Sequence, residues 1–92
     1  MSRNTLEFQP GAILHEVIVG AFRARGMTFE AWCRDNGITP TNARQATFGQ
    51  SRGASGKLMR EALIEAAGRE FVQDAYVRRV SEHYRQVTGG AA

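Results

Sequence analysis

Apolar residues recur along this chain at the three- and four-residue spacings of amphipathic helices. The clearest series predicts a helix over residues 10–25, which Gly26 ends. Pro10 suits the first position of this helix, because a proline there gives up no hydrogen bond. Residues 1–9 carry no such period and are expected to form a flexible N-terminal arm. The apolar positions of the helix are Ile13, Leu14, Val17, Ile18, Ala21 and Phe22.

Two short helices joined by a turn with glycine are predicted next. Thr28 is the expected N-cap of the first, which covers residues 29–36 and ends at Gly37. Thr39, followed directly by proline, is the expected N-cap of the second, over residues 40–48.

Small side chains allow these two helices to approach closely. Cys33 falls where they cross, and Ala43 and Ala46 are the small residues that face it. Ile38 is expected to be buried beneath the turn, and Trp32 to anchor the pair to the helix before it. A buried cysteine in such a position is usually inert, so we expect a structural role for it.

The segment over residues 49–56 is rich in glycine and serine and predicts a loop, in which Ser55 is the expected N-cap of a fourth helix that Gly68 ends. With the helices before it, this helix completes a predicted core over residues 10–68. Its buried side is expected to consist of Leu58, Met59, Ala62, Leu63 and Ala66.

A long fifth helix is predicted over residues 69–88, followed by a disordered tail over residues 89–92. Its first half is expected to cover the core with Phe71, Val72, Tyr76 and Val80. No segment has the two-residue period of a strand. The predicted fold class is therefore all-α, a compact bundle of about five helices.

The distribution of charged residues indicates a localised positive charge. The net charge of the 92 residues is +3, but residues 23–60 hold seven Lys and Arg against two acids, a net +5. No acid lies between Ile38 and Arg60. Such a field attracts polyanions, because neutralising phosphates releases condensed counterions.

Polar side chains off the packing stripe of the 40–48 helix are of the types that contact DNA bases. Arg can bridge two acceptors of guanine, and Asn or Gln can do the same for adenine. The predicted base-contacting residues are Thr39, Thr41, Asn42, Arg44 and Gln45, and Thr47 also falls off the predicted stripe. Predicted phosphate contacts come from Thr28, at the start of the preceding helix, and from Arg52 and Lys57.

The stretch from Thr28 to Gly49, with its Gly37-Ile38-Thr39 turn, resembles the lambda-repressor-like helix-turn-helix family. The five-helix arrangement is similar to small phage regulators of the Mu Ner type. The resemblance covers about residues 10–67; in the family Ala is commoner than Cys33, and a larger aliphatic residue is commoner at position 43. It implies a regulator that binds double-stranded DNA through a recognition helix over residues 40–48.

The sequence lacks the residues that several other classes of function require. A single cysteine and two isolated histidines cannot form a four-ligand zinc site. The Gly56-Lys57 pair is followed by Leu58 where a phosphate-binding loop needs Ser or Thr. The sequence thus predicts no catalytic residue, cofactor or metal. It contains no apolar run long enough to span a membrane and no signal-peptide pattern, so a cytoplasmic, nucleoid-associated protein is expected.

The fifth helix raises the question of partners. Val77, Val80, Tyr84 and Val87 keep a 3-4-3 spacing beyond the length that the core requires, which favours a homodimer. One alternative is a protein-binding helical adaptor, in which this helix and the Trp32 region dock a partner such as a polymerase or a toxin. Another is an architectural protein that binds DNA without sequence preference.

Overall fold

Local capping signals determine where the two short central helices begin and end. In the computed structural model, which describes residues 8–51 and 53–89, the Thr28 hydroxyl accepts the Ala31 N–H at 3.1 Å. The Thr39 hydroxyl accepts the Asn42 N–H at 3.3 Å. Gly37, in the turn between the two helices, has a φ of +70°, which favours glycine over any side chain. The predicted caps and turn are therefore confirmed.

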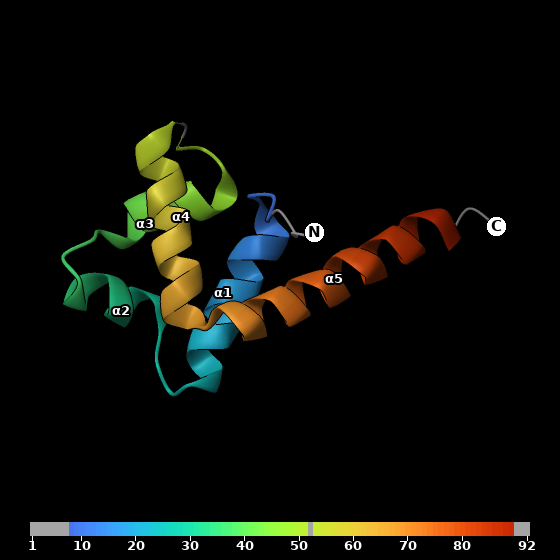
Figure 1. Cartoon of the computed structure of the whole chain (residues 1–92), viewed down its shortest axis with the longest axis horizontal. Coiled ribbons are helices and arrows are strands. Elements are labelled where there is room, and N and C mark those ends of the chain that lie inside the picture. Colours follow the sequence, from blue (N-terminus) through green and yellow to red (C-terminus); the bar gives the residue numbers. More distant parts are fainter. Residues whose placement is uncertain (1–7, 52, 90–92) are drawn as a thin grey trace, which may run out of the picture.

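The described part of the chain forms five helices and contains no strand, which confirms the all-α prediction (Figure 1). The helices are α1 (Ala12–Ala24), α2 (Phe29–Asp35), α3 (Pro40–Phe48), α4 (Ala54–Ala67) and α5 (Arg69–Gly89). α1 is central, because it packs against each of the other four.

The apolar stripe of α1 forms the middle of the core. Five of its six predicted positions are buried, and Ile13 is half-buried against them. The Phe22 ring lies 6.3 Å from the Phe29 ring and 5.7 Å from the Trp32 ring, so α2 is attached to α1 through aromatic contacts. Cys33 and Ala43 are fully buried, as predicted. Ile38, which was expected to be buried, is only half-buried at the edge of the core.

The segment before α1 differs from the prediction. Gly11 is the N-cap of α1, so Pro10 lies before the helix rather than at its first position. Phe8 and Gln9 were expected in a flexible arm, but both contact α5: the Phe8 ring lies 5.2 Å from the Tyr76 ring, and the Gln9 N–H donates to the Tyr76 hydroxyl at 2.9 Å. The rest of the predicted arm, residues 1–7, lies outside the described residues.

The buried side of α4 was predicted correctly only in part: Leu63 is buried, and Met59 and Ala66 pack partly buried against the core. Its N-cap is Gly53, not Ser55, and it faces the core with Gly56, Leu63, Ile64 and Ala67. Leu58 is 70% exposed and Ala62 is exposed. A Cβ atom at Gly56 would collide with the Ser51 carbonyl, so this glycine lets the loop close onto the helix. Positions 56 and 58 lie about 200° apart around a helix, so burying the glycine turns the leucine outward.

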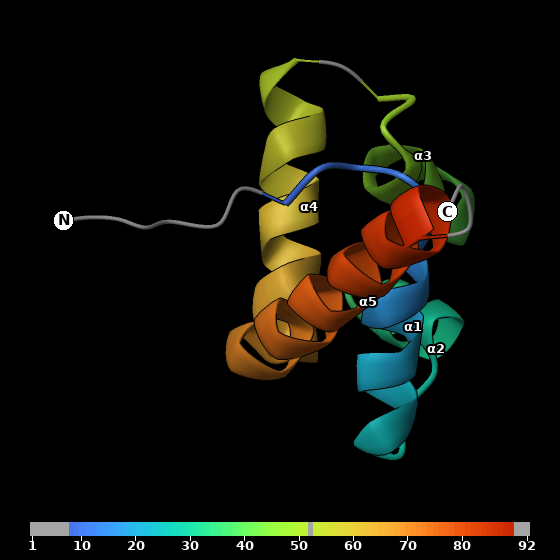
Figure 2. The same ribbon diagram turned by 90° about the vertical axis from the view of Figure 1, so that its right-hand side faces the viewer.

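α5 covers the core with fewer residues than predicted. Val72 and Tyr76 are buried, but Phe71 and Val80 are exposed. Figures 1 and 2 show that α5 begins at the foot of α4, crosses α1 and continues away from the other helices. Every described residue from position 77 to position 87 is exposed, although the Arg79 guanidinium still donates to the Glu16 carboxylate of α1 at 2.7 Å.

The orientation of α4 predicts unequal costs for two leucine substitutions. Leu63→Ala removes a fully buried side chain and is expected to lower the free energy of unfolding by about 2–5 kcal/mol. Leu58→Ala, on the opposite face, is expected to change it by less than about 0.5 kcal/mol. Urea denaturation followed by circular dichroism measures both; equal losses would contradict the orientation of α4.

Candidate nucleic-acid interface

α3 lies at the surface of the protein with one face exposed. Its buried side packs against α1, α2 and α4, and within the described residues no part of α5 approaches it (Figure 1). The opposite side presents three exposed polar residues, Thr41, Asn42 and Gln45. α5 therefore leaves this face uncovered.

Hydrogen bonds from three other segments hold the C-terminal end of α3. The Gly11 N–H donates to the Thr47 carbonyl at 2.9 Å, and the Arg60 guanidinium donates to the Ala46 carbonyl at 3.2 Å. The Gln50 N–H donates to the Gln45 carbonyl at 2.8 Å. These donors satisfy carbonyls that a helix end leaves unpaired. With Thr39 capping its first turn, α3 is fixed at both ends.

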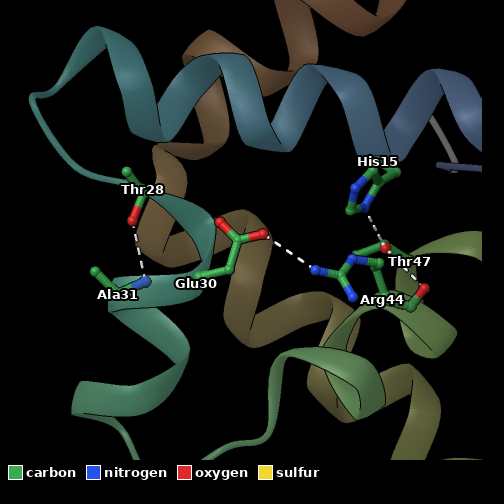
Figure 3. A network of polar contacts seen from close by, with 6 residues as sticks. All are labelled: His15, Thr28, Glu30, Ala31, Arg44 and Thr47. Carbon is green, nitrogen blue, oxygen red and sulfur yellow. Dashed lines mark hydrogen bonds and ion pairs between the residues drawn. The ribbon is translucent and has the colours of Figure 1, made fainter.

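The predicted base-contacting residues have different surroundings. Thr41, Asn42 and Gln45 are exposed. Thr39 is also exposed, but its hydroxyl already caps α3. The Arg44 side chain extends along the flank of α3 toward α2, where a terminal nitrogen donates to the Glu30 carboxylate at 3.1 Å (Figure 3).

Thr47 belongs to the core rather than to the exposed face. It was predicted off the packing stripe, yet it is fully buried. Its hydroxyl donates to the Arg44 carbonyl at 3.0 Å and lies 2.8 Å from Nδ1 of His15 (Figure 3). The single hydroxyl proton is already used, so His15 Nδ1 carries a proton and donates to this oxygen. Both polar atoms are satisfied, which explains why a threonine is tolerated there.

Burial keeps His15 neutral at the junction of α1 and α3. Loss of solvent lowers the pKa of His15, and the positive charge of Arg44 lowers it further; Glu16 and Glu30 oppose the shift. Its ring stacks on the Phe48 ring at 4.5 Å and meets the Phe29 ring edge-on at 5.1 Å. The site thus holds an uncharged imidazole between aromatic rings.

Glu30 balances the charge of Arg44. A hydrogen bond from its own backbone N–H lowers the pKa of Glu30, and Arg44 lowers it further through a hydrogen bond and its charge. The carboxylate is therefore ionised at neutral pH. These two residues lie 14 positions apart on different helices, so no sequence period could have shown that they pair.

Two of the three residues that were predicted to contact phosphate lie in the part of the chain that the structure describes. Thr28 is exposed at the N-terminus of α2, with its hydroxyl engaged as the cap. Lys57 is exposed on the first turns of α4. Arg52 lies outside the described residues.

Phe48 also belongs to the exposed face of α3, and this residue was not predicted from the sequence. It is the last residue of α3 and is 39% exposed. It lies three residues after Gln45 and seven after Thr41, so the three share one side of the helix. This spacing was visible in the sequence and could have identified it.

Groups associated with catalysis are sparse. Cys33 is buried, and loss of solvent raises the pKa of its thiol, so it stays protonated. Within residues 8–51 and 53–89, no three His, Cys, Asp or Glu side chains come together as a metal site would require. Among the described helices, none is long and apolar enough to cross a membrane.

Comparison with family models, curated proteins and solved structures finds no match to this chain.

The lowered pKa of His15 predicts a pH dependence of stability. The unfolded chain binds a proton at the ordinary pKa of 6.5, whereas the folded imidazole stays neutral to lower pH. The stability that the neutral His15 contributes is fully present above pH 6.5, the ordinary pKa. It is lost as the pH falls through the lower pKa of the folded state. Urea denaturation at about pH 7.5 and about pH 5.5 measures the loss.

His15→Asn is the matched variant, because its amide nitrogen takes the place of Nδ1 and can still donate to Thr47 but does not titrate. We expect the free energy of unfolding to fall less between the two pH values in this variant than in the wild type. An identical fall in both proteins would show that His15 is not held neutral.

Proposed function

We propose that this protein binds double-stranded DNA with sequence preference and acts as a transcriptional regulator of the lambda-repressor-like helix-turn-helix type, similar to small phage regulators. The observation that carries this proposal is the exposed side of α3. Apart from Phe48 it is polar, it lies in a stretch without an acid from Ile38 to Arg60, and it is left uncovered by α5. A helix with these properties has the size and chemistry to enter the major groove.

The surroundings of each side chain suggest its role. Gln45, Asn42 and Thr41 are exposed and would contact base edges. Arg44 keeps donors beyond the one that Glu30 accepts, so it can still bind a base or an adjacent phosphate from the flank of α3. Lys57 would bind phosphate, which positions the protein without specifying sequence.

The N-terminus of α2 supports an orientation in which α3 faces the DNA. Its helix dipole favours an anion, and the Glu30 carboxylate in its first turn is paired with Arg44, so Thr28 and its neighbours would face the DNA backbone while α3 enters the groove. Such a regulator works in the cytoplasm, on the nucleoid.

The distal half of α5 supports assembly as a homodimer. Val77, Val80 and Val87 are exposed on one side of the distal half of α5, and Tyr84 continues their 3-4-3 spacing. Two copies paired along this side would bury these residues. A two-fold dimer would then bind two half-sites about 34–36 Å apart.

Selection of bound sequences from a random DNA pool tests the proposal as a whole. We expect a preferred sequence with two-fold symmetry and an affinity that falls with salt. Binding that persists equally on scrambled DNA would favour an architectural protein. The absence of any salt-dependent affinity would favour a protein-binding adaptor and would overturn the proposal.

Two substitutions separate base contacts from phosphate contacts. Gln45→Ala is expected to cost about 1–3 kcal/mol on the selected site and to relax one base position. Lys57→Ala is expected to weaken binding to all sequences alike and to reduce the salt slope by about 1. Fluorescence anisotropy titrations at several salt concentrations measure both. Identical behaviour of the two variants would show that α3 is not the recognition helix.

The dimer has its own test. The wild-type protein is expected to sediment as a dimer on its site, and Val80→Glu as a monomer, because a charge would be buried between the two α5 helices. Leu58→Glu places the same charge on an exposed leucine of α4 and is expected to leave the dimer intact. A wild-type monomer both free and on DNA would contradict the proposed pairing.

A further inference from the structure

Phe48 is unusual among the exposed apolar side chains because of its place on α3. The others described belong to α4, α5 and the segment before α2. Helical side chains lean toward the N-terminus, so the Phe48 ring lies over the turn that carries Arg44 and Gln45. Its exposed surface thus adjoins the polar groups that the proposed function assigns to base contacts.

The ring is held rather than loose. One of its faces stacks on the His15 imidazole at 4.5 Å with an angle of 29° between the planes. The imidazole is itself fixed by its hydrogen bond to the buried Thr47 hydroxyl. The outer part of the ring remains in solvent, which accounts for the 39% exposure. A fixed apolar surface binds with little loss of side-chain entropy.

DNA offers one apolar group in the major groove, the C5-methyl group of thymine, and a phenylalanine side chain is one of its known partners. Resting on the proposed function, we infer that Phe48 contacts a thymine methyl group and so specifies a T·A base pair beside the pair contacted by Gln45. His15 is then a positioning residue, which supports the ring without touching DNA.

Deoxyuridine provides the probe, because it differs from thymidine only by lacking this methyl group. Each thymine of the selected DNA site is replaced singly, and the affinities of the wild-type protein for the thymine and uracil duplexes are compared by fluorescence anisotropy. We expect one thymine in each half-site at which the replacement weakens binding about 3–10-fold, the effect of one buried methyl group.

Three variants assign the effect to the ring. In Phe48→Ala the thymine and uracil duplexes should bind equally. In Phe48→Leu, which keeps an apolar but shorter side chain, part of the discrimination should remain. Leu58→Ala, which removes an exposed apolar side chain from α4, should discriminate as the wild type does. The ratio of two affinities for one protein sample does not depend on its folded fraction, so a loss of stability in Phe48→Ala cannot imitate the result.

The outcomes separate this inference from the proposed function. If no preferred sequence is selected, the proposed function fails and this inference fails with it. If a site is selected and Gln45→Ala weakens binding to it, but no uracil replacement does, only the assignment of Phe48 is overturned. Discrimination that is unchanged in Phe48→Ala would likewise overturn it.

Discussion

The close packing of α3 on α1 and α4 is the constraint on which the rest of the structure depends. Ala43 and Ala46 bring the backbone of α3 near its neighbours, and Thr47 adds a buried hydroxyl whose hydrogen bonds are satisfied within the core. Because these three residues occupy one side of a nine-residue helix, Thr41 and Gln45 necessarily face outward. The same packing that stabilises the fold thus determines which chemistry is available to a partner.

Electrostatics reinforces this division between a packed and an exposed side. Burial keeps His15 uncharged beneath α3, and Glu30 pairs with Arg44 on the partly exposed flank. Apart from Phe48, the exposed face is polar; it carries no acid, and the Glu30 carboxylate on the flank is paired with Arg44. A surface of this kind can approach a polyanion without repulsion while its amides and hydroxyls remain available for hydrogen bonds.

Local signals in the sequence predicted most of the fold. The caps at Thr28 and Thr39 and the apolar stripe of α1 depend on residues close in the chain, and the structure confirms them. Features set by contacts of a helix with other segments were missed or wrong. The orientation of α4 depends on Gly56 meeting Ser51 across a loop, and the pairing of Arg44 depends on how α2 crosses α3. Amphipathic periodicity contains neither kind of information.

Backbone amide chemical shifts recorded by NMR during titration with the selected DNA test the central claim most directly. If α3 enters the major groove, the largest changes should fall on Thr41 to Gln45, with smaller ones at the start of α2 and near Lys57, and the distal half of α5 should change only through pairing of two copies. Changes confined to α5, with α3 unaffected at saturation, would contradict the account.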